Sequence, residues 1–257
     1  MATRTRRTQR RTEALSRERI VEAAVELLDT AGEGGLTFRA LTERLATGPG
    51  AIYWHVANKD ELLDAATDAV VAAALAAERA ESAGRAGSAG PAEPPNSPQD
   101  KIRAIAFGLF DAMEDHPWLP TQLALQLSRS PWGSVTPQIF ESIGRQVRAL
   151  GVPEGHWFTA TSALVHYILG AAGQNAANSA TARTRVPDVD RAEFLDAASK
   201  AWKELDPDDY PFTRAVAAQM RDHDDREQFL AGIDLVLTGI TALHLPGERG
   251  STPPPAP

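Results

Sequence analysis

Apolar residues in this sequence recur at steps of three and four along most of its length, the spacing of an α-helix with one buried face. The first such run begins after Ser16, a residue type that caps helices, and ends at Gly32, which favours a helix stop. No segment shows the alternation of apolar and polar residues that is typical of a half-buried strand. The pattern therefore predicts an all-α protein.

Three short helices are expected before the first long one. Thr37 can cap a second helix after the run 16–31, and Pro49 suits the first position of a brief third helix. Asn58, followed three residues later by Glu61, can cap a long Ala-rich helix. Two helices joined by a tight turn and braced by another have the geometry of a helix-turn-helix, whose second helix can enter the major groove of DNA. We therefore expect a helix-turn-helix domain over residues 16–64.

The rest of the chain divides at segments rich in proline, glycine and serine. Residues 82–98 have this composition and are expected to form a flexible loop. Residues 1–15 are expected to be a basic, disordered arm, and residues 246–257 a disordered tail. Between them, residues 65–245 are expected to form a helical domain, with helices near 98–116, 118–127, 136–150, 156–178, 191–205, 211–221 and 225–245.

The net charge of −8 is unevenly distributed. Residues 1–60 hold ten Lys and Arg against eight Asp and Glu, a balance of +2, which leaves sixteen against twenty-six, a balance of −10, in the remainder. Five arginines lie within the first twelve residues, where no acidic residue occurs. A basic arm of this kind is attracted to nucleic-acid phosphate, although a solvated tail has the same composition.

Composition and motifs argue against several other classes. No apolar run reaches the roughly 18 residues of a membrane span, and no apolar stretch follows the N-terminal arginines as in a secretory signal, so we expect a cytoplasmic protein. The absence of cysteine excludes disulfides and thiolate metal sites. No hydrolase, zinc-protease or phosphate-loop motif occurs, so we expect no enzyme, no cofactor and no metal. The acidic residues around His223 leave metal binding open, with a solvated surface as the alternative.

Residues 48–59, Gly-Pro-Gly-Ala-Ile-Tyr-Trp-His-Val-Ala-Asn-Lys, closely resemble the recognition-helix signature of the tetracycline-repressor (TetR) family. Leu36 to Arg39 also resemble the start of that family's second helix. The resemblance extends over residues 16–64 and weakens downstream. It implies a DNA-binding transcriptional regulator with a helical domain that dimerises and binds a small effector. The departures from the family pattern, at Phe38, Ala46-Thr47 and Gly48, affect the operator sequence rather than DNA binding itself.

The residue chemistry of this segment also suits DNA. The small residues at 49–51 let the third helix approach base edges, and Tyr53 and His55 can reach phosphate oxygens. Lys59 is unfavourable at a helix N-terminus unless it shares a phosphate with the N–H groups there. Arg39 resembles the family position that reads a guanine, for which an arginine fork is suited. The expected DNA-binding residues are Thr37, Arg39, Pro49, Gly50, Ala51, Tyr53, Trp54, His55 and Lys59.

Several of these residues have a structural alternative when each is considered singly. Tyr53 can be a core aromatic, and Trp54 can brace the third helix against the first. His55 can be a surface histidine, and Arg39 can belong to a solvated face. The combination of Tyr53, His55 and Arg39 in one short segment favours DNA binding over these alternatives, whereas for Trp54 the structural role, bracing the third helix, is favoured.

The last expected helix, 225–245, carries more apolar surface than one buried stripe requires. Its residues Phe229, Ile233, Val236, Ile240 and Leu243 step by four, three, four and three, the spacing of a seam between helices. We therefore expect this seam to join two chains into a homodimer. Its two helix-turn-helix domains, called heads below, are expected to lie about 34–36 Å apart and to read a palindromic operator. The alternative is a helix buried within its own chain.

Aromatic side chains with polar tips are common in the body, where they can line a ligand cavity or fill an ordinary core. Residues 163–170 resemble part of a long helix of the tetracycline-binding branch, and Gln146 resembles a drug-contacting glutamine there. Gln174 stands where that branch implies an acid serving a metal-bound drug, so we expect a mostly apolar organic effector instead of magnesium–tetracycline. His166 is either a ligand contact or a core histidine. The expected effector-binding residues are Phe110, Trp118, Trp132, Gln146, His166, Tyr167 and Gln174.

The sequence as a whole predicts a homodimeric repressor that a small organic effector releases from a palindromic operator. An activator of the same architecture stays open, as does a TetR-like interaction protein without DNA binding. A ligand can change operator affinity only if it binds two states of the dimer unequally.

Overall fold

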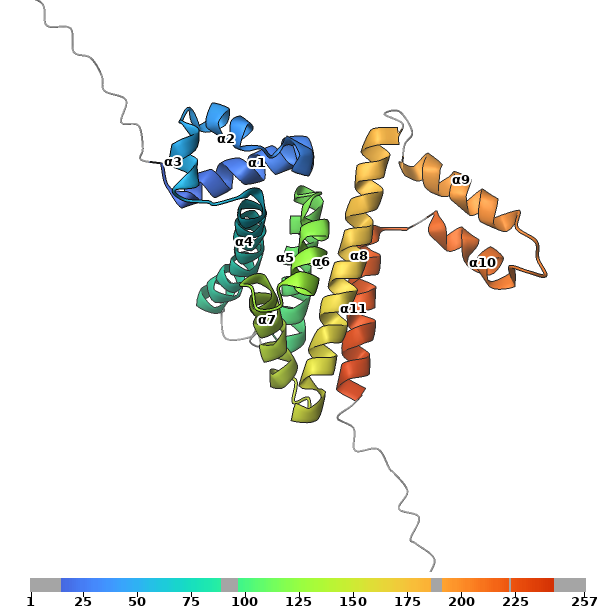
Figure 1. The fold of residues 1–257 in the computed structure, drawn as a ribbon. Coiled ribbons are helices and arrows are strands. Elements are labelled where there is room, and N and C mark those ends of the chain that lie inside the picture. The colour runs from blue at the N-terminus through green and yellow to red at the C-terminus, as the bar shows by residue number, and fades with distance from the viewer. Residues whose placement is uncertain (1–14, 89–96, 186–190, 222, 243–257) are drawn as a thin grey trace, which may run out of the picture. The chain divides into compact units, whose positions relative to one another are not determined.

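The computed structural model describes residues 15–88, 97–185, 191–221 and 223–242, and their regular structure is entirely helical (Figure 1). The all-α class expected from the apolar spacing is therefore confirmed. The chain divides into two compact units after Ala66. The expected basic arm, apart from residue 15, and the expected tail at 246–257 lie outside the described residues. No helix in the described part of the chain has the length and apolar character needed to cross a membrane.

The first unit consists of three helices and the beginning of a fourth, α1 (Arg17–Gly35), α2 (Phe38–Leu45), α3 (Pro49–Tyr53) and α4 (Lys59–Ser88). Ser16 caps α1 by accepting a hydrogen bond from the Arg19 N–H at 3.3 Å, as its residue type predicts. Thr37 caps α2 in the same way, accepting from the Ala40 N–H at 3.1 Å. Gly32 has a positive φ of 63°, which interrupts α1 at the expected stop.

The core of the first unit takes apolar side chains from each of its helices. Ile20 of α1, Leu41 of α2 and Ile52 of α3 are all 0% exposed. Burying each such side chain stabilises the unit by about 1.5–3 kcal/mol. Ala46 joins α2 to α3 in the left-handed conformation (φ 50°), which costs an L-residue about 1–2 kcal/mol. The buried contacts hold this tight turn and thereby fix the direction of α3 relative to α2.

The second unit contains the rest of α4 and a bundle in which α5, α8 and α11 run side by side, with α6 and α7 packed against them (Figure 1). Helix α4 continues to Ser88, so it occupies the first part of the segment 82–98 for which the composition predicts a loop, and residues 89–96 lie outside the described residues. The bounds of the bundle helices are α5 (Pro98–Asp115), α6 (Leu119–Arg129), α7 (Val135–Ala149), α8 (Trp157–Arg185) and α11 (Asp225–Ala242).

Two further helices, α9 (Arg191–Lys203) and α10 (Pro211–Val216), form a hairpin, and short 3₁₀ turns occupy Glu154–His156 and Ala217–Met220. The guanidinium of Arg214 closes the loop of this hairpin by donating to the backbone oxygens of Lys203 and Leu205. An ion pair between Arg191 and Asp225, at 2.5 Å, links the first residue of α9 to the first residue of α11.

The bundle core lies where α5, α8 and α11 meet. Phe110 of α5 is 2% exposed, and its ring centroid lies 4.7 Å from that of Phe229 of α11. Leu164 and Ile168 of α8 and Ile233 of α11 are also buried. Because apolar side chains from three helices interlock here, the bundle provides a rigid frame for the cavity described below.

Candidate nucleic-acid interface and ligand cavity

Helix α3 buries one side chain and exposes most of the others. Ile52 points into the core, whereas Pro49 and Gly50 at the start of the helix are exposed and Tyr53 at its end is 53% exposed. Gly48 precedes the helix without a side-chain cap, and Pro49 occupies its first turn. Side chains this small let the backbone approach the base edges of a DNA groove.

Tyr53 is held from the side by Phe38, the first residue of α2. The two rings are stacked, with centroids 4.5 Å apart and an interplanar angle of 12°. The stack restricts where the Tyr53 ring can point while leaving the residue about half exposed. From the sequence, Phe38 was expected on the apolar face of the second helix and as a departure from the family pattern, but its contact with Tyr53 was not predicted. An apolar residue at a position that is often polar was the available signal.

Trp54, which follows α3 directly, is 89% exposed. An indole this exposed does not pack against α1, so the structural alternative for this residue, bracing α3, is wrong. His55 is half-buried, and its N–H donates to the Ile52 carbonyl at 2.9 Å. Neither Tyr53 nor His55 is sealed in the core, which leaves both accessible to a partner.

Arg39 is an exposed cation with an intramolecular partner. Its side chain is 88% exposed, and its Nε donates to Oε1 of Glu43, one helical turn away, at 2.9 Å. The hydrogen bond and the charge of Glu43 raise the pKa of Arg39, so the guanidinium stays protonated. To contact a guanine, Arg39 would therefore have to break its hydrogen bond with Glu43 and form one with the base. The hydroxyl of Thr37 is already used as the cap of α2.

Lys59 also has a partner that the sequence did not reveal. Its Nζ donates to the backbone oxygen of Glu33, in the last turn of α1, at 2.5 Å. Around it, Asn58 accepts from the Glu61 N–H at 2.8 Å, and Glu61 accepts from the Ala57 N–H at 2.8 Å. A DNA phosphate would therefore have to compete with a backbone carbonyl for the Lys59 ammonium group.

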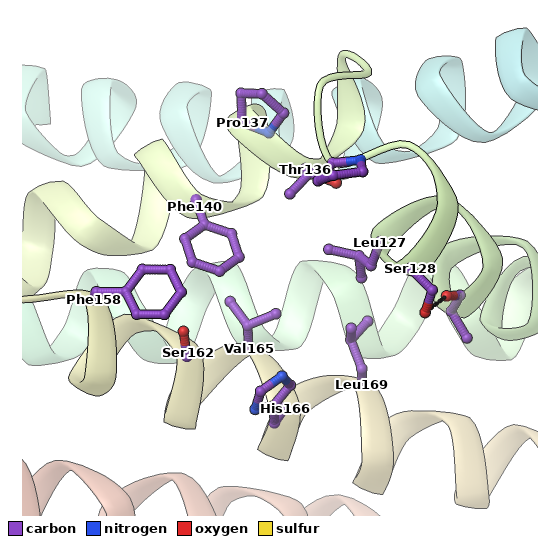
Figure 2. A pocket seen from close by; sticks show the side chains of 12 residues that line it. Leu127, Ser128, Thr136, Pro137, Phe140, Phe158, Ser162, Val165, His166 and Leu169 are labelled. Carbon is purple, nitrogen blue, oxygen red and sulfur yellow. Dashed lines mark hydrogen bonds between the residues drawn. The ribbon is translucent and has the colours of Figure 1, made fainter.

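A cavity of about 770 Å³ opens between α6, α7 and α8 in the second unit (Figure 2). Phe140 of α7 and Phe158 of α8 form one end, with ring centroids 6.0 Å apart and an interplanar angle of 27°. Its apolar wall and its few polar groups are contributed by Ala124, Leu127, Ser128, Pro131, Thr136, Pro137, Ser162, Val165, His166 and Leu169. A space of this size and lining suits a small organic molecule.

Of the expected effector-binding residues, His166 alone lines this cavity. Phe110 and Trp118 are buried, while Trp132 is 82% exposed in the turn after α6. Tyr167 donates to the Phe229 backbone oxygen at 3.1 Å and stacks on the Phe229 ring, so it joins α8 to α11. Gln146 is half-buried on α7, and Gln174 is exposed and donates to Asn178 at 3.0 Å.

Most of the residues that line the cavity were not predicted from the sequence. Phe158, Ser162, Val165 and Leu169 follow one another at steps of four, three and four, so they share one face of α8. That spacing was readable from the sequence. What the sequence could not supply is the position of the ends of α6 and α7 over this face.

The predicted dimer seam is corrected by the structure. Phe229, Ile233 and Ile240 are 5% exposed or less, because this stripe of α11 packs against α5 and α8 of the same chain. Val236 is half-buried, and Leu243 lies outside the described residues. The alternative, a helix buried within its own chain, holds for this stripe. The side that α11 leaves exposed carries Ala231, Leu235, Thr238, Gly239 and Ala242.

Asp225, one of the acidic residues around His223, is engaged in ion pairs. His223 Nε2 lies 2.7 Å from Oδ1 of Asp225, whose second oxygen pairs with Arg191. Among the described residues, no group of three or more His, Asp or Glu side chains is placed to hold a metal ion.

A helix-turn-helix unit with exposed aromatic and cationic side chains on and beside its third helix defines a DNA-binding transcriptional regulator. The sequence profile described as "Bacterial regulatory proteins, tetR family" matches residues 20–66. The profile "Tetracyclin repressor-like, C-terminal domain" matches residues 90–244, which is more than half of the chain. The chain belongs to the TetR family. It is a regulator and not an enzyme, as the sequence analysis expected.

A solved structure shares both sequence and fold with this chain over nearly its whole length. The transcriptional regulator SCO7222, a TetR from Streptomyces coelicolor, is 70% identical, with a TM-score of 0.77. The match covers 90% of this chain and all of that one. Its description as a transcriptional regulator agrees with the class that the fold defines.

Two curated relatives are matched over shorter segments. An HTH-type transcriptional regulator of Saccharopolyspora erythraea is 31% identical over 156 residues, which cover 61% of this chain and 59% of that protein. The tetracycline repressor protein class C of Escherichia coli is 47% identical over 57 residues, 22% of this chain and 26% of the repressor. The chain thus matches less than two thirds of the length of these two relatives.

Two solved structures with low sequence identity show the fold alone. ActR of Streptomyces coelicolor, in complex with actinorhodin, is 22% identical, with a TM-score of 0.67 over 90% of this chain and 97% of that one. BioQ with its double-stranded DNA operator is 24% identical, with a TM-score of 0.53 over 89% of this chain and 99% of that one.

Proposed function

We propose that this regulator is a homodimeric repressor, acting in the cytoplasm, that leaves a palindromic operator when a small organic effector occupies the cavity between α6, α7 and α8. The observation that carries the DNA-binding part is the exposure of Tyr53 and Trp54 at the end of α3, above a fully buried Ile52. Burying a large aromatic side chain away from water lowers the free energy of the protein. The exposure of two such side chains at one short helix therefore indicates a surface that binds a partner. BioQ, which shares the fold, was solved with its DNA operator.

The dimer is proposed to form through the exposed sides of α8 and α11. Ala163 and Gly170 on α8, and Ala231 and Gly239 on α11, are exposed and small, which lets helices of two chains approach closely. Leu235, in the middle of this side of α11, is 75% exposed. Packing the two helices of each copy into a four-helix bundle would bury Leu235 and pair two heads for successive major grooves.

The effector part rests on the cavity and on the architecture. ActR, which has the same fold, was solved in complex with actinorhodin. An effector releases the operator only if it binds more tightly to a state of the dimer that does not fit the DNA. The effector and the DNA then stabilise different states, so binding of one weakens binding of the other. Repression is proposed rather than activation because the tetracycline repressor protein class C of Escherichia coli is 47% identical to this chain over 57 residues.

The test is selection of bound sequences from random duplex DNA, followed by fluorescence anisotropy at several salt concentrations. We expect a palindromic site whose half-sites are about one helical turn apart, and an affinity that falls steeply as salt rises. Arg39→Ala should relax the preference at one base pair in each half-site, because Arg39 is the expected guanine contact. Binding that is absent, or equal at all salt concentrations, would overturn the proposal.

Arg145→Ala provides a matched control. Arg145 is also an exposed arginine paired with a glutamate one helical turn away, but it lies on α7 of the second unit. The Arg145→Ala substitution should leave both the affinity for DNA and the sequence preference unchanged. A loss of affinity common to both variants would show that net charge, and not base contact, explains the effect of Arg39.

A further inference from the structure

The wall of the cavity carries almost no charge. Among the described residues that line it, none is Asp, Glu, Lys or Arg, and His166 is the only ionisable group. His166 is exposed and lies on the side of α8 that also carries Val165 and Leu169 (Figure 2). Moving an ion from water into an apolar site without a counter-charge is strongly unfavourable. The lining therefore selects against charged ligands.

The two phenylalanines at the end of the cavity favour a flat ring. Phe140 and Phe158 lie nearly parallel, and Phe158 is 76% exposed although its side chain is entirely apolar. Their centroids are too close, at 6.0 Å, for a further ring to fit between them. A flat aromatic ligand resting on Val165 and Leu169 could instead extend the stack and cover Phe158.

Hydrogen-bonding groups line this apolar surface on all three helices, Ser128 on α6, Thr136 on α7, and Ser162 and His166 on α8. Ser162 and His166 are four residues apart on α8, so they project in similar directions along the cavity wall. A neutral imidazole has one donor and one acceptor nitrogen, and a hydroxyl can do both. One polar, uncharged group on the ligand can therefore be bound here, while the rest of the ligand lies on apolar side chains.

We propose that the cavity binds an uncharged, flat aromatic molecule that bears a hydroxyl group, with the ring against Phe158 and the hydroxyl hydrogen-bonded to His166. The role of this ligand in regulation rests on the proposed function, which assigns the effector to the same cavity. What is added here is the chemical class of the ligand and the two residues that select it.

The test uses three probes with the same ring system, naphthalene, 2-naphthol and 2-naphthoate, which differ in hydrogen bonding and charge. Isothermal titration at neutral pH with the full chain should show 2-naphthol binding tightest and 2-naphthoate at least roughly tenfold more weakly, because its carboxylate is ionised. His166→Leu should weaken 2-naphthol by roughly fivefold or more and leave naphthalene unchanged. Phe158→Ala should weaken both by a similar factor, because it removes ring contact alone.

Phe194→Ala serves as the control variant. Phe194 is also an exposed phenylalanine, 64% exposed, but it lies on α9 and does not line the cavity. It should bind all three probes like the unchanged chain. Circular dichroism of each variant checks that the helices are retained, which is expected because both Phe158 and His166 are exposed.

Three results would overturn the proposal. If 2-naphthoate binds as tightly as 2-naphthol, the cavity does not select against charge. If His166→Leu weakens naphthalene and 2-naphthol equally, His166 makes no hydrogen bond to the hydroxyl. If none of the probes binds, the cavity is not an aromatic site. These measurements contain no DNA, so their failure is distinct from a failure of operator binding, which the selection experiment measures.

Discussion

Ile52 and Trp54 lie two positions apart at α3 and have opposite surroundings. Ile52 is 0% exposed and anchors the helix, whereas Trp54 is 89% exposed. Both are large and apolar, so composition alone would send both to the core. Residues two positions apart lie on opposite sides of a helix, so α3 can bury only one of them, and its packing on the first unit decides that this one is Ile52. At this scale, the exposed tryptophan identifies the surface proposed for DNA.

Trp54→Ala is expected to separate DNA binding from folding. Because the indole makes little contact with its own unit, the free energy of unfolding should change by less than about 0.5 kcal/mol. Operator affinity should fall, on the order of tenfold, as the ring's contact with DNA is lost. Anisotropy and urea denaturation measure the two effects. An unchanged affinity would remove Trp54 from the interface.

Ile52→Ala is the matching control from the same helix. It should lower the free energy of unfolding by about 2–5 kcal/mol, because it leaves a cavity under α3. Any loss of DNA binding by this variant should parallel the loss of folded protein.

At the scale of the element, α5 begins with a complete capping box. The Ser97 hydroxyl accepts from the Asp100 N–H at 3.2 Å, and the Asp100 carboxylate accepts from the Ser97 N–H at 3.2 Å. The hydrogen bond from the Ser97 hydroxyl, at 2.7 Å, is the main reason that the pKa of Asp100 is lowered. The charge of Arg103 lowers it further.

Asp100→Ala should therefore destabilise the protein in a pH-dependent way. A carboxyl whose pKa is lower in the folded state stabilises that state at pH values above the unfolded pKa, and this contribution is lost as pH falls through the folded pKa. We expect a loss of about 1 kcal/mol at neutral pH that diminishes below about pH 4. Urea denaturation across pH tests this. Asp115→Ala, at the other end of α5, should show no such loss.

Helices α8 and α11 pack closely at a glycine. A Cβ at position 232 would overlap the hydroxyl oxygen and ring of Tyr167, whose hydroxyl donates to the α11 backbone. Burial between the helices raises the pKa of Tyr167. The close approach is therefore specific to Gly232, and the tyrosine fixes the distance between the two helices.

Gly232→Ala is expected to lower the free energy of unfolding by at least about 2 kcal/mol, because rigid backbone and ring must move apart. In Gly144→Ala, the new methyl would be 3.5 Å from the Thr161 hydroxyl, an ordinary contact. That variant should gain up to about 1 kcal/mol from helix propensity. Thermal unfolding of both variants measures the contrast, and equal behaviour would contradict the close packing at Gly232.

At the scale of the whole molecule, the proposed dimer depends on which side of α11 faces outward. The buried stripe contains Ile233, and the exposed side contains Leu235. Two neighbouring apolar residues on one helix thus have different tasks, one in the core and one at the proposed interface between chains.

Leu235→Glu is expected to give folded monomers, since two charged side chains would meet at the interface. Ile233→Glu should instead unfold the chain, because a carboxylate would be buried without a partner. Phe194→Glu, on α9, should remain dimeric. Sedimentation measures mass, and circular dichroism measures folding. A folded dimer of Leu235→Glu would place the interface elsewhere.

The sequence alone determined the helical class, the position of most helices and the family. These follow from local physics, because apolar spacing, capping residues such as Ser16, Thr37 and Ser97, and stops such as Gly32 act within a few turns of the chain. The signature at residues 48–59 is equally local, so it was readable without a structure.

Tertiary structure decided which of several equivalent apolar residues is buried, and by what. The steps of three and four in α11 are the same for a core stripe and a dimer seam, and only the packing of α5 and α8 assigns Phe229 and Ile233 to the core. The partners of Lys59 and Tyr53, Glu33 and Phe38, lie on other helices, and the three helices around Phe158 and His166 follow one another in the chain but meet only in the fold. A sequence pattern records the period of a helix face, whereas the neighbour that covers that face is set by the fold.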